Sequence, residues 1–236
     1  MAETVFITGA DKGLGFALVE RFLCGGFHVF AGTYRSSDNL AGLRERFPES
    51  LTIVPLDVTR MTSIRAAAKR VARQVSALDV LVNNAGINMQ EQGRRLLEEA
   101  DFTDRHLETI MAVNTFGPLR VVQQFLPLLQ QGRRKLVINI SSEAGSIADC
   151  GRQAEFAYCM SKSALNMQSK LLQNYLGPQG FKVLALQPGW MRTDMGGPDA
   201  LISANEAAEG IFTLAARDWT PEDPIYLDYQ GNVLPW

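Results

Sequence analysis

The segment between Val5 and Leu23 constrains the fold of this chain more than any other. A short run of β-branched and aromatic residues, Val5 to Thr8, leads into Gly9-Ala-Asp-Lys-Gly-Leu-Gly15, and apolar residues with helical spacing follow from Phe16 to Leu23. A strand, a glycine turn and a helix in this order are typical of a dinucleotide site, because glycines let the backbone approach a pyrophosphate and the helix N-terminus offers unpaired N–H groups. The spacing Gly-x-x-x-Gly-x-Gly differs from the commoner fingerprint, so a glycine-rich turn without a phosphate ligand is the alternative.

The same alternation of strands and helices continues along the chain. Further strands are predicted at 27–33, 51–55, 78–82, 135–140, 181–187 and 225–228, and helices at 38–47, 61–75, 103–131, 157–176 and 205–216. Within 103–131 we expect a kink at Gly117-Pro118, because proline removes one backbone donor. The alternation predicts an α/β fold of the Rossmann type, a doubly wound parallel sheet with helices on both faces and ligands at the carboxyl ends of its strands. No repeat or linker interrupts the 236 residues, so a single domain over residues 1–236 is predicted.

Composition argues against several other classes of protein. The formal net charge of -2 gives no electrostatic reason to expect a nucleic acid or an anionic membrane as partner. Three widely spaced cysteines argue against a disulfide framework and for a reducing compartment, and two histidines outside any cysteine cluster argue against structural zinc. The first residues lack the pattern of a signal peptide and no apolar run is long enough to span a bilayer. A cytoplasmic location without stable membrane insertion is therefore expected.

Arg35 lies at the end of the second predicted strand, where dinucleotide folds distinguish their cofactors. An acidic residue there bonds the ribose 2′-hydroxyl of NAD, whereas an arginine accommodates the 2′-phosphate of NADP. The chain has no carboxylate after this strand before Asp38, and Lys12 adds a second cation inside the glycine turn. Two cations that clamp a phosphate predict a preference for NADP(H) over NAD(H). Alternatively, both side chains are exposed and hold no ligand.

Small and polar residues follow other predicted strands, at the sheet edge where a ligand should lie. Asp57, after the third strand, is placed to accept a hydrogen bond from an adenine amino group. Asn83-Asn84-Ala85-Gly86, after the fourth, allows backbone approach to a cofactor, although it also makes an ordinary turn. Ser141-Ser142 ends the fifth strand and either places a hydroxyl in the crevice or starts a turn. Asn114 interrupts the apolar pattern of helix 103–131 and needs a partner for its amide.

Tyr158 and Lys162 are four residues apart in the predicted helix 157–176 and therefore share one face. An ammonium group beside a phenol stabilises the phenolate, which would lower the pKa of Tyr158 from about 10 toward neutrality and fit it for acid–base catalysis. For this pair taken alone, a surface tyrosine beside a solvated lysine is the alternative.

Together these motifs resemble those of the short-chain dehydrogenase/reductase family, and the resemblance runs through the whole chain. They are Thr8-Gly9-x-x-x-Gly13-x-Gly15, Asn83-Asn84-Ala85-Gly86, Asn114, Ser142, Tyr158-x-x-x-Lys162 and Pro188-Gly189. The stretches 158–167, 188–198 and 228–236 are similar to the C-factor (C-signal) branch and its sniffer-type carbonyl reductase relatives. Some members of that branch are regarded mainly as developmental signals.

The resemblance implies a role for each residue of the site. Tyr158 is the acid/base, Ser142 polarises the carbonyl, Lys162 holds the nicotinamide ribose and tunes Tyr158, and Asn114 anchors a water in the proton relay. Ser141 is the competing serine, and Ser142 is favoured because the family usually uses the second of such a pair. No metal site is expected. Cofactor contacts are expected from Gly9, Lys12, Gly13, Leu14, Gly15, Arg35, Asp57, Val58, Asn83, Ala85, Gly86, Tyr158, Lys162, Pro188, Gly189, Met191 and Thr193.

The predicted function is reduction of a small aldehyde, ketone or quinone to an alcohol by NADPH. Trp190, Met191 and Met195 suggest a small apolar substrate pocket, or equally core. The resemblance implies a homodimer or homotetramer that shares the helices carrying Asn114 and Tyr158, although the leucines of the helix 157–176 equally suit an intrachain core. The alternative function is C-signal-like signalling or cofactor sensing with little turnover. A hydrolase is less consistent with the pattern, because neither serine lies in a nucleophile elbow.

Overall fold

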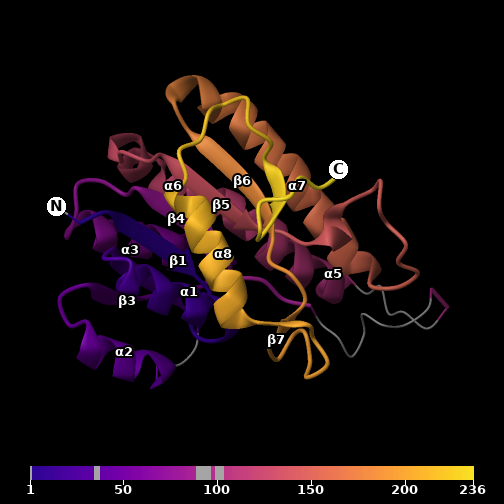
Figure 1. Ribbon diagram of the computed structural model, residues 1–236, viewed down its shortest axis with the longest axis horizontal. Helices are drawn as coiled ribbons and strands as arrows, with labels where there is room; N and C mark the ends of the chain where they lie inside the picture. The colour runs from indigo at the N-terminus through magenta and orange to yellow at the C-terminus, as the bar shows by residue number, and fades with distance from the viewer. Residues whose placement is uncertain (1, 35–37, 89–96, 99–103) are drawn as a thin grey trace.

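The computed structural model describes residues 2–34, 38–88, 97–98 and 104–236, which form a central sheet covered by helices (Figure 1). The seven strands lie in the order β3-β2-β1-β4-β5-β6-β9, and every neighbouring pair is parallel. The order reverses between β1 and β4, which opens a crevice at their carboxyl ends. The predicted doubly wound parallel sheet is confirmed. Its strands are β1 Thr4–Thr8, β2 His28–Thr33, β3 Leu51–Pro55, β4 Val80–Asn83, β5 Leu136–Ile140, β6 Lys182–Gln187 and β9 Tyr226–Asp228.

Helices cover both faces of the sheet because its strands carry apolar residues on both sides. In β1, Val5 and Ile7 belong to one buried cluster and Phe6 belongs to the other, as the two-residue period of a strand requires. Helices α1, α2 and α8 pack on the first cluster, and Figure 1 shows α1 and α8 together on that face. Helices α3, α6 and α7 pack on the second. The helices are α1 Gly13–Cys24, α2 Ala41–Arg46, α3 Met61–Ala72, α5 Asp104–Met111, α6 Gly117–Gln131, α7 Phe156–Leu176 and α8 Ala204–Ala216.

The long predicted helix 103–131 is irregular at a different point from the one expected. A π-helical turn, Ala112–Phe116, separates α5 from α6, and the N–H of Gly117 bonds the carbonyl of Ala112. The irregularity therefore precedes Gly117-Pro118. Pro118 lies in the first turn of α6, where helices tolerate a residue without an N–H donor. Single π turns inside α-helices are frequent at functional sites, and this one carries Asn114.

Two short strands were not predicted. β7, Met191–Arg192, pairs in parallel with β8, Ile202–Ser203, outside the central sheet. Strands of two residues are too short for a periodic pattern, so the sequence carries no signal for them. They hold the segment that follows β6 over the glycine turn before α1.

Three further observations concern the cysteines, the metal-binding side chains and the helices of the described residues. Cys24, Cys150 and Cys159 are all free. No cluster of three or more histidine, cysteine, aspartate or glutamate side chains there could bind a metal ion. Among the same residues, no helix combines the length and the apolar character needed to cross a bilayer.

Candidate active site

The glycine turn after β1 is bonded to the loop after β4. The hydroxyl of Thr8 accepts from the N–H groups of Asn84 (3.0 Å) and Ala85 (2.9 Å), and the Asn84 amide donates to the carbonyls of Thr8 (2.9 Å) and Gly9 (3.0 Å). Gly9 has a φ of +64°, which favours glycine, and a Cβ on Gly15 would lie 2.0 Å from the Gly9 carbonyl oxygen. The turn therefore needs glycine at both positions. Asn84 is a positioning residue that the sequence analysis did not single out from its neighbour Asn83.

The N-terminus of α1 fits a phosphate group. The helix begins at Gly13, its N-cap residue Lys12 makes no side-chain cap, and its first turn carries no acidic residue. The free N–H groups and the positive end of the helix dipole are thus available to an anion. Leu14 is buried in the core, so only its backbone can serve a ligand.

The segment after β6 lies over this turn. A Cβ on Gly13 would stand 3.5 Å from the methyl group of Thr193, and the ammonium of Lys12 pairs with Asp194. Both partners of that ion pair are largely exposed, so the pair itself adds little stability. Two of the predicted cofactor residues, Lys12 and Thr193, are thereby brought to the same end of α1.

Arg35, the predicted partner of a 2′-phosphate, lies outside the described residues. Its neighbour Tyr34 donates its backbone N–H to both carboxylate oxygens of Asp11, at 3.0 and 3.2 Å. The side chain of Asn39 donates to the Asp11 carbonyl at 2.9 Å. These bonds tie the end of β2 to the glycine turn.

Other predicted cofactor residues use their side chains within the fold. The Asp57 carboxylate accepts from the N–H (2.9 Å) and hydroxyl (2.6 Å) of Thr59, closing its own turn. Val58 is buried, and a Cβ on Gly117 would lie 3.1 Å from its Cβ. Asn83 is buried too, and its amide donates to Asn139 on β5 at 2.8 Å. Asn83 and Val58 can therefore offer a cofactor their backbone only.

Asn114 is buried inside the π turn, and its amide is fully bonded. Its oxygen accepts from the N–H of Ile87 (2.8 Å), and its nitrogen donates to the Ile87 carbonyl (2.8 Å) and the Ser161 hydroxyl (3.0 Å). Asn114 thus holds the loop after β4 against α7. A Cβ on Gly86 would lie 3.5 Å from the Asn114 oxygen and 3.8 Å from the Lys162 nitrogen, so these residues converge. The expected water anchored by Asn114 stays a prediction.

The electrostatic expectation for Tyr158 and Lys162 is wrong in this structure. Burial raises the pKa of Tyr158 to about 12, and hydrogen bonding to Ser142 opposes this rise. The Lys162 ammonium lies 5.6 Å from the centre of the Tyr158 ring and donates to the carbonyl of Ile140 at 2.8 Å. Burial also lowers the pKa of Lys162 to about 8. Desolvation is therefore the largest influence on the pKa of both groups, and Tyr158 is protonated at neutral pH.

The two serines after β5 face different partners. The Ser141 hydroxyl is buried and donates to Asn166 on α7 at 2.6 Å. The Ser142 hydroxyl lies on the side of Tyr158, accepts from the N–H of Ala144 (3.1 Å) and donates to the Glu143 carboxylate (2.8 Å). Of the pair, Ser142 is the one placed to act together with Tyr158.

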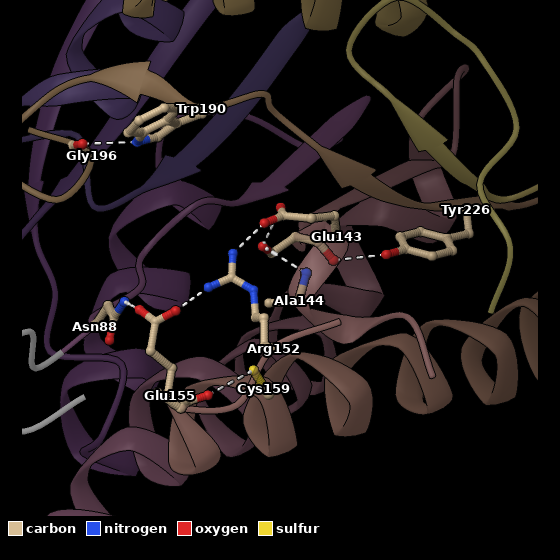
Figure 2. Close-up of polar contacts among 11 residues, drawn as sticks. Asn88, Glu143, Ala144, Arg152, Glu155, Cys159, Trp190, Gly196 and Tyr226 are labelled. Atoms are coloured by element: carbon tan, nitrogen blue, oxygen red, sulfur yellow. Dashed lines mark hydrogen bonds and ion pairs between the residues drawn. The ribbon is translucent and has the colours of Figure 1, made fainter. Parts of the chain in front are cut away.

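A chain of charged side chains borders Ser142 and was not predicted. Figure 2 shows Arg152 between Glu143 and Glu155, with Asn88 on the other side of Glu155. Arg152 donates to both carboxylates, and the Asn88 amide donates to Glu155 at 2.7 Å. Glu143, Arg152 and Glu155 come from the irregular connection between β5 and α7, and Asn88 comes from the loop after β4, so no periodic spacing in the sequence could have revealed the chain.

The segment that begins at Pro188 and Gly189 carries one partly buried and two exposed large apolar side chains. Met191 packs against the core, whereas Trp190 is half exposed and Met195 is exposed. The Trp190 indole donates to the Gly196 carbonyl at 2.8 Å, which closes the loop on itself (Figure 2). Of the three residues suggested for an apolar pocket, Met191 is core.

Comparisons with known proteins agree with this geometry. A family model described as short chain dehydrogenase matches residues 3–200. The C-signal of Myxococcus xanthus is 37% identical over 159 residues, which cover 67% of this chain and 93% of that protein. The crystal structure of an NADPH-bound carbonyl reductase from chicken fatty liver is similar with a TM-score of 0.90 at 31% identity, over 100% of this chain and 99% of the other. The carbonyl reductase Sniffer of D. melanogaster has a TM-score of 0.92 at 27% identity and is covered fully, as is this chain.

Proposed function

This chain belongs to the short-chain dehydrogenase family, and on that basis we propose that it reduces an aldehyde, ketone or quinone to an alcohol with NADPH. The observation that carries the proposal is the meeting of Ser142, Tyr158, Lys162 and Asn114 at the carboxyl ends of β4 and β5. They lie beside a glycine turn whose helix N-terminus is free to bind a phosphate. Such a site joins a cofactor cradle to a proton donor.

The chain's own residues divide the work as follows. When bound, NADPH supplies a hydride to the carbonyl carbon. The Ser142 hydroxyl turns its proton from Glu143 to the carbonyl oxygen and polarises it, and Tyr158 delivers a proton to that oxygen. Because burial keeps Tyr158 protonated at neutral pH, its hydroxyl has the proton that the reduction of a carbonyl requires.

Lys162 and Asn114 support this chemistry by orienting the parts of the site and by supplying protons to Tyr158. Lys162 is placed to hold the nicotinamide ribose and to restore the proton of Tyr158. Asn114 keeps the loop of Gly86 and Ile87 against α7, where a nicotinamide would approach. The other cofactor contacts come from the glycine turn, the loop after β4 and the segment from Pro188 to Thr193.

The preference for NADP(H) is part of the proposal. Lys12 borders the glycine turn, Arg35 follows β2 in the sequence, and the similar chicken carbonyl reductase is NADPH-bound. An Arg35→Asp variant is expected to lose its preference for NADPH over NADH, because a carboxylate repels a 2′-phosphate. An unchanged ratio of kcat/KM for the two cofactors would contradict this assignment.

The decisive experiment is the Tyr158→Phe variant. Oxidation of NADPH is followed across a panel of aldehydes, ketones and quinones, and NADPH binding is measured separately. Turnover should fall by at least about 100-fold, the usual contribution of a general acid, while NADPH binds within about twofold of the wild type. Turnover close to that of the wild type would refute the proposal.

A second candidate is a signalling or cofactor-sensing role on the same scaffold. The similarity to C-signal, 37% identity over 67% of this chain, is the observation that favours it. The same panel separates the candidates, since tight NADPH binding without turnover of any carbonyl would favour sensing. A scaffold role alone does not require Asn114, Ser142, Tyr158 and Lys162 together.

We also propose that the protein self-associates in the cytoplasm. On α7, exposed Met160, Met167, Leu171 and Tyr175 follow one face at spacings of seven and four residues. A second copy that packs the same helix against this face would cover them. The three free cysteines support a reducing compartment.

A further inference from the structure

The hydroxyl that would contact the substrate lies beside a carboxylate. The Ser142 hydroxyl donates to the Glu143 carboxylate at 2.8 Å. A carbonyl oxygen that accepts from Ser142 would thus stand next to Glu143. The Glu143 side chain is 53% exposed, so it faces solvent on that side of the site.

Arg152 alone does not cancel this carboxylate. Arg152 is shared between Glu143 and Glu155, so two carboxylates meet one guanidinium and one negative charge remains. Glu155 is only 15% exposed and also accepts from Asn88 at 2.7 Å. It lies on the side of the Arg152 guanidinium opposite Glu143 (Figure 2). Burial raises the pKa of Glu143, but hydrogen bonds from Arg152 and Ser142 outweigh it and keep the carboxyl ionised at neutral pH.

Among the described residues, Lys162 is the other cation of the site, and its charge interacts with that of Glu143. Lys162 is buried and donates to the Ile140 carbonyl at 2.8 Å. Arg152 directs one N–H group of each terminal nitrogen to a carboxylate, so its charge is already engaged by Glu143 and Glu155. A carboxylate next to the reacting carbonyl would approach Glu143, because Glu143 accepts a hydrogen bond from Ser142 itself.

We propose that Glu143, balanced by Arg152, is a specificity-determining residue that excludes carbonyl compounds with a carboxylate next to the reacting carbonyl and selects neutral ones. This inference rests on the proposed reductase function and names its substrate class. Repulsion between two charges a few ångströms apart in a partly exposed site corresponds to about a fivefold to twentyfold difference in kcat/KM. The effect weakens as the salt concentration rises, because ions screen exposed charges.

The test compares methyl benzoylformate with benzoylformate in the full chain with saturating NADPH; the two compounds share the reacting ketone, and the ester replaces the carboxylate charge with a methyl ester. The wild type should prefer the ester. Glu143→Gln should shift the ester-to-acid ratio of kcat/KM toward the acid by about fivefold to twentyfold, and Arg152→Gln should shift it toward the ester. Asp149→Asn, which removes an exposed carboxylate of the same loop, is the control for net charge and should leave the ratio unchanged.

Because the two variants should shift the ester-to-acid ratio in opposite directions, the test separates an effect of charge from an effect on the structure of the site. A merely structural role would lower kcat/KM for both substrates and leave the ratio unchanged in Glu143→Gln, and that result would overturn the inference. A shift in the same direction for Glu143→Gln and Arg152→Gln would overturn it too. If neither compound is turned over by the wild type, the proposed function fails for this substrate class. The inference is then judged by the same ratio in the affinities of the two compounds for the complex with NADP⁺.

Discussion

The hydroxyl of Tyr226 donates a 2.7 Å hydrogen bond to the backbone carbonyl of Ser142, joining residues 84 positions apart. Tyr226 lies on the edge strand β9 and is buried, and its ring stacks on Trp236 with centroids 5.1 Å apart. The same carbonyl accepts from the N–H of Gly145 at 3.0 Å. The last strand of the sheet therefore holds the serine that is expected to polarise the substrate.

Replacing Tyr226 by phenylalanine should loosen this support. Loss of one buried hydrogen bond should cost about 1 kcal/mol of unfolding free energy, or about 2–4 °C in Tm, and should lower kcat more than NADPH affinity. Tyr229→Phe is the control, since its hydroxyl makes only an exposed 3.4 Å contact with Glu206. Equal thermal shifts and equal kcat values for the two variants would contradict a special role for Tyr226.

Lys162 should make the stability of the cofactor-free protein depend on pH. Its pKa is lowered by burial to about 8, below the value of about 10.4 in an unfolded chain, so the unfolded state binds more protons between these values. The contribution of the lysine is thus unfavourable at low pH and is relieved as pH rises through 8. The free energy of unfolding of the wild type, relative to Lys162→Met, should increase by about 2 kcal/mol between about pH 7.5 and 9.5. The exposed Lys170→Met on the same helix should show no such trend, and a flat difference for Lys162→Met would refute the argument.

Gly15 should not tolerate a side chain. An added Cβ would stand 2.0 Å from the Gly9 oxygen and 2.6 Å from the Asn84 amide nitrogen. Gly15→Ala should destabilise the fold by about 1–3 kcal/mol and weaken NADPH binding by more than about tenfold, because the turn must open. Gly42→Ala, whose Cβ would meet no atom within 4 Å, is the matched control in chemical denaturation and NADPH titration. Unchanged NADPH affinity in Gly15→Ala would contradict the assignment of the turn to the cofactor.

Carboxylates introduced by mutation on the exposed apolar face of α7 should prevent self-association. Met167 and Leu171 are 62% and 59% exposed, and a partner helix would bury both. The double variant Met167→Glu, Leu171→Glu should sediment as a monomer at concentrations where the wild type is a dimer or tetramer, because each buried carboxylate would lack a partner. Asn174→Glu, on an exposed position of the same helix, should keep the wild-type assembly. A wild type that is itself monomeric at all concentrations would refute the proposed interface.

Most of the fold could be predicted because its signals are local. Apolar runs and helical spacing predicted the strands of the central sheet and their alternation with helices, and the observed bounds differ by a few residues where ends fray. The resemblance pointed to Tyr158, Lys162, Ser142 and Asn114 as one site, and the structure brings these residues together. The exceptions are the π turn, displaced from Pro118 toward Asn114, and the two-residue strands β7 and β8.

Two contacts around the site were outside the reach of sequence reasoning. Arg152 meets Glu143 within one irregular loop that has no periodic pattern, and Tyr226 of β9 bonds Ser142 from 84 positions away. The direction of the Tyr158 pKa likewise depends on burial, which is a property of the packed molecule. The order of residues along the chain specified a dinucleotide fold with a Tyr-x-x-x-Lys pair. Packing is responsible for the desolvation that keeps the tyrosine protonated and for the bond from Tyr226 that holds Ser142, because both arise from atoms brought together across the sheet edge.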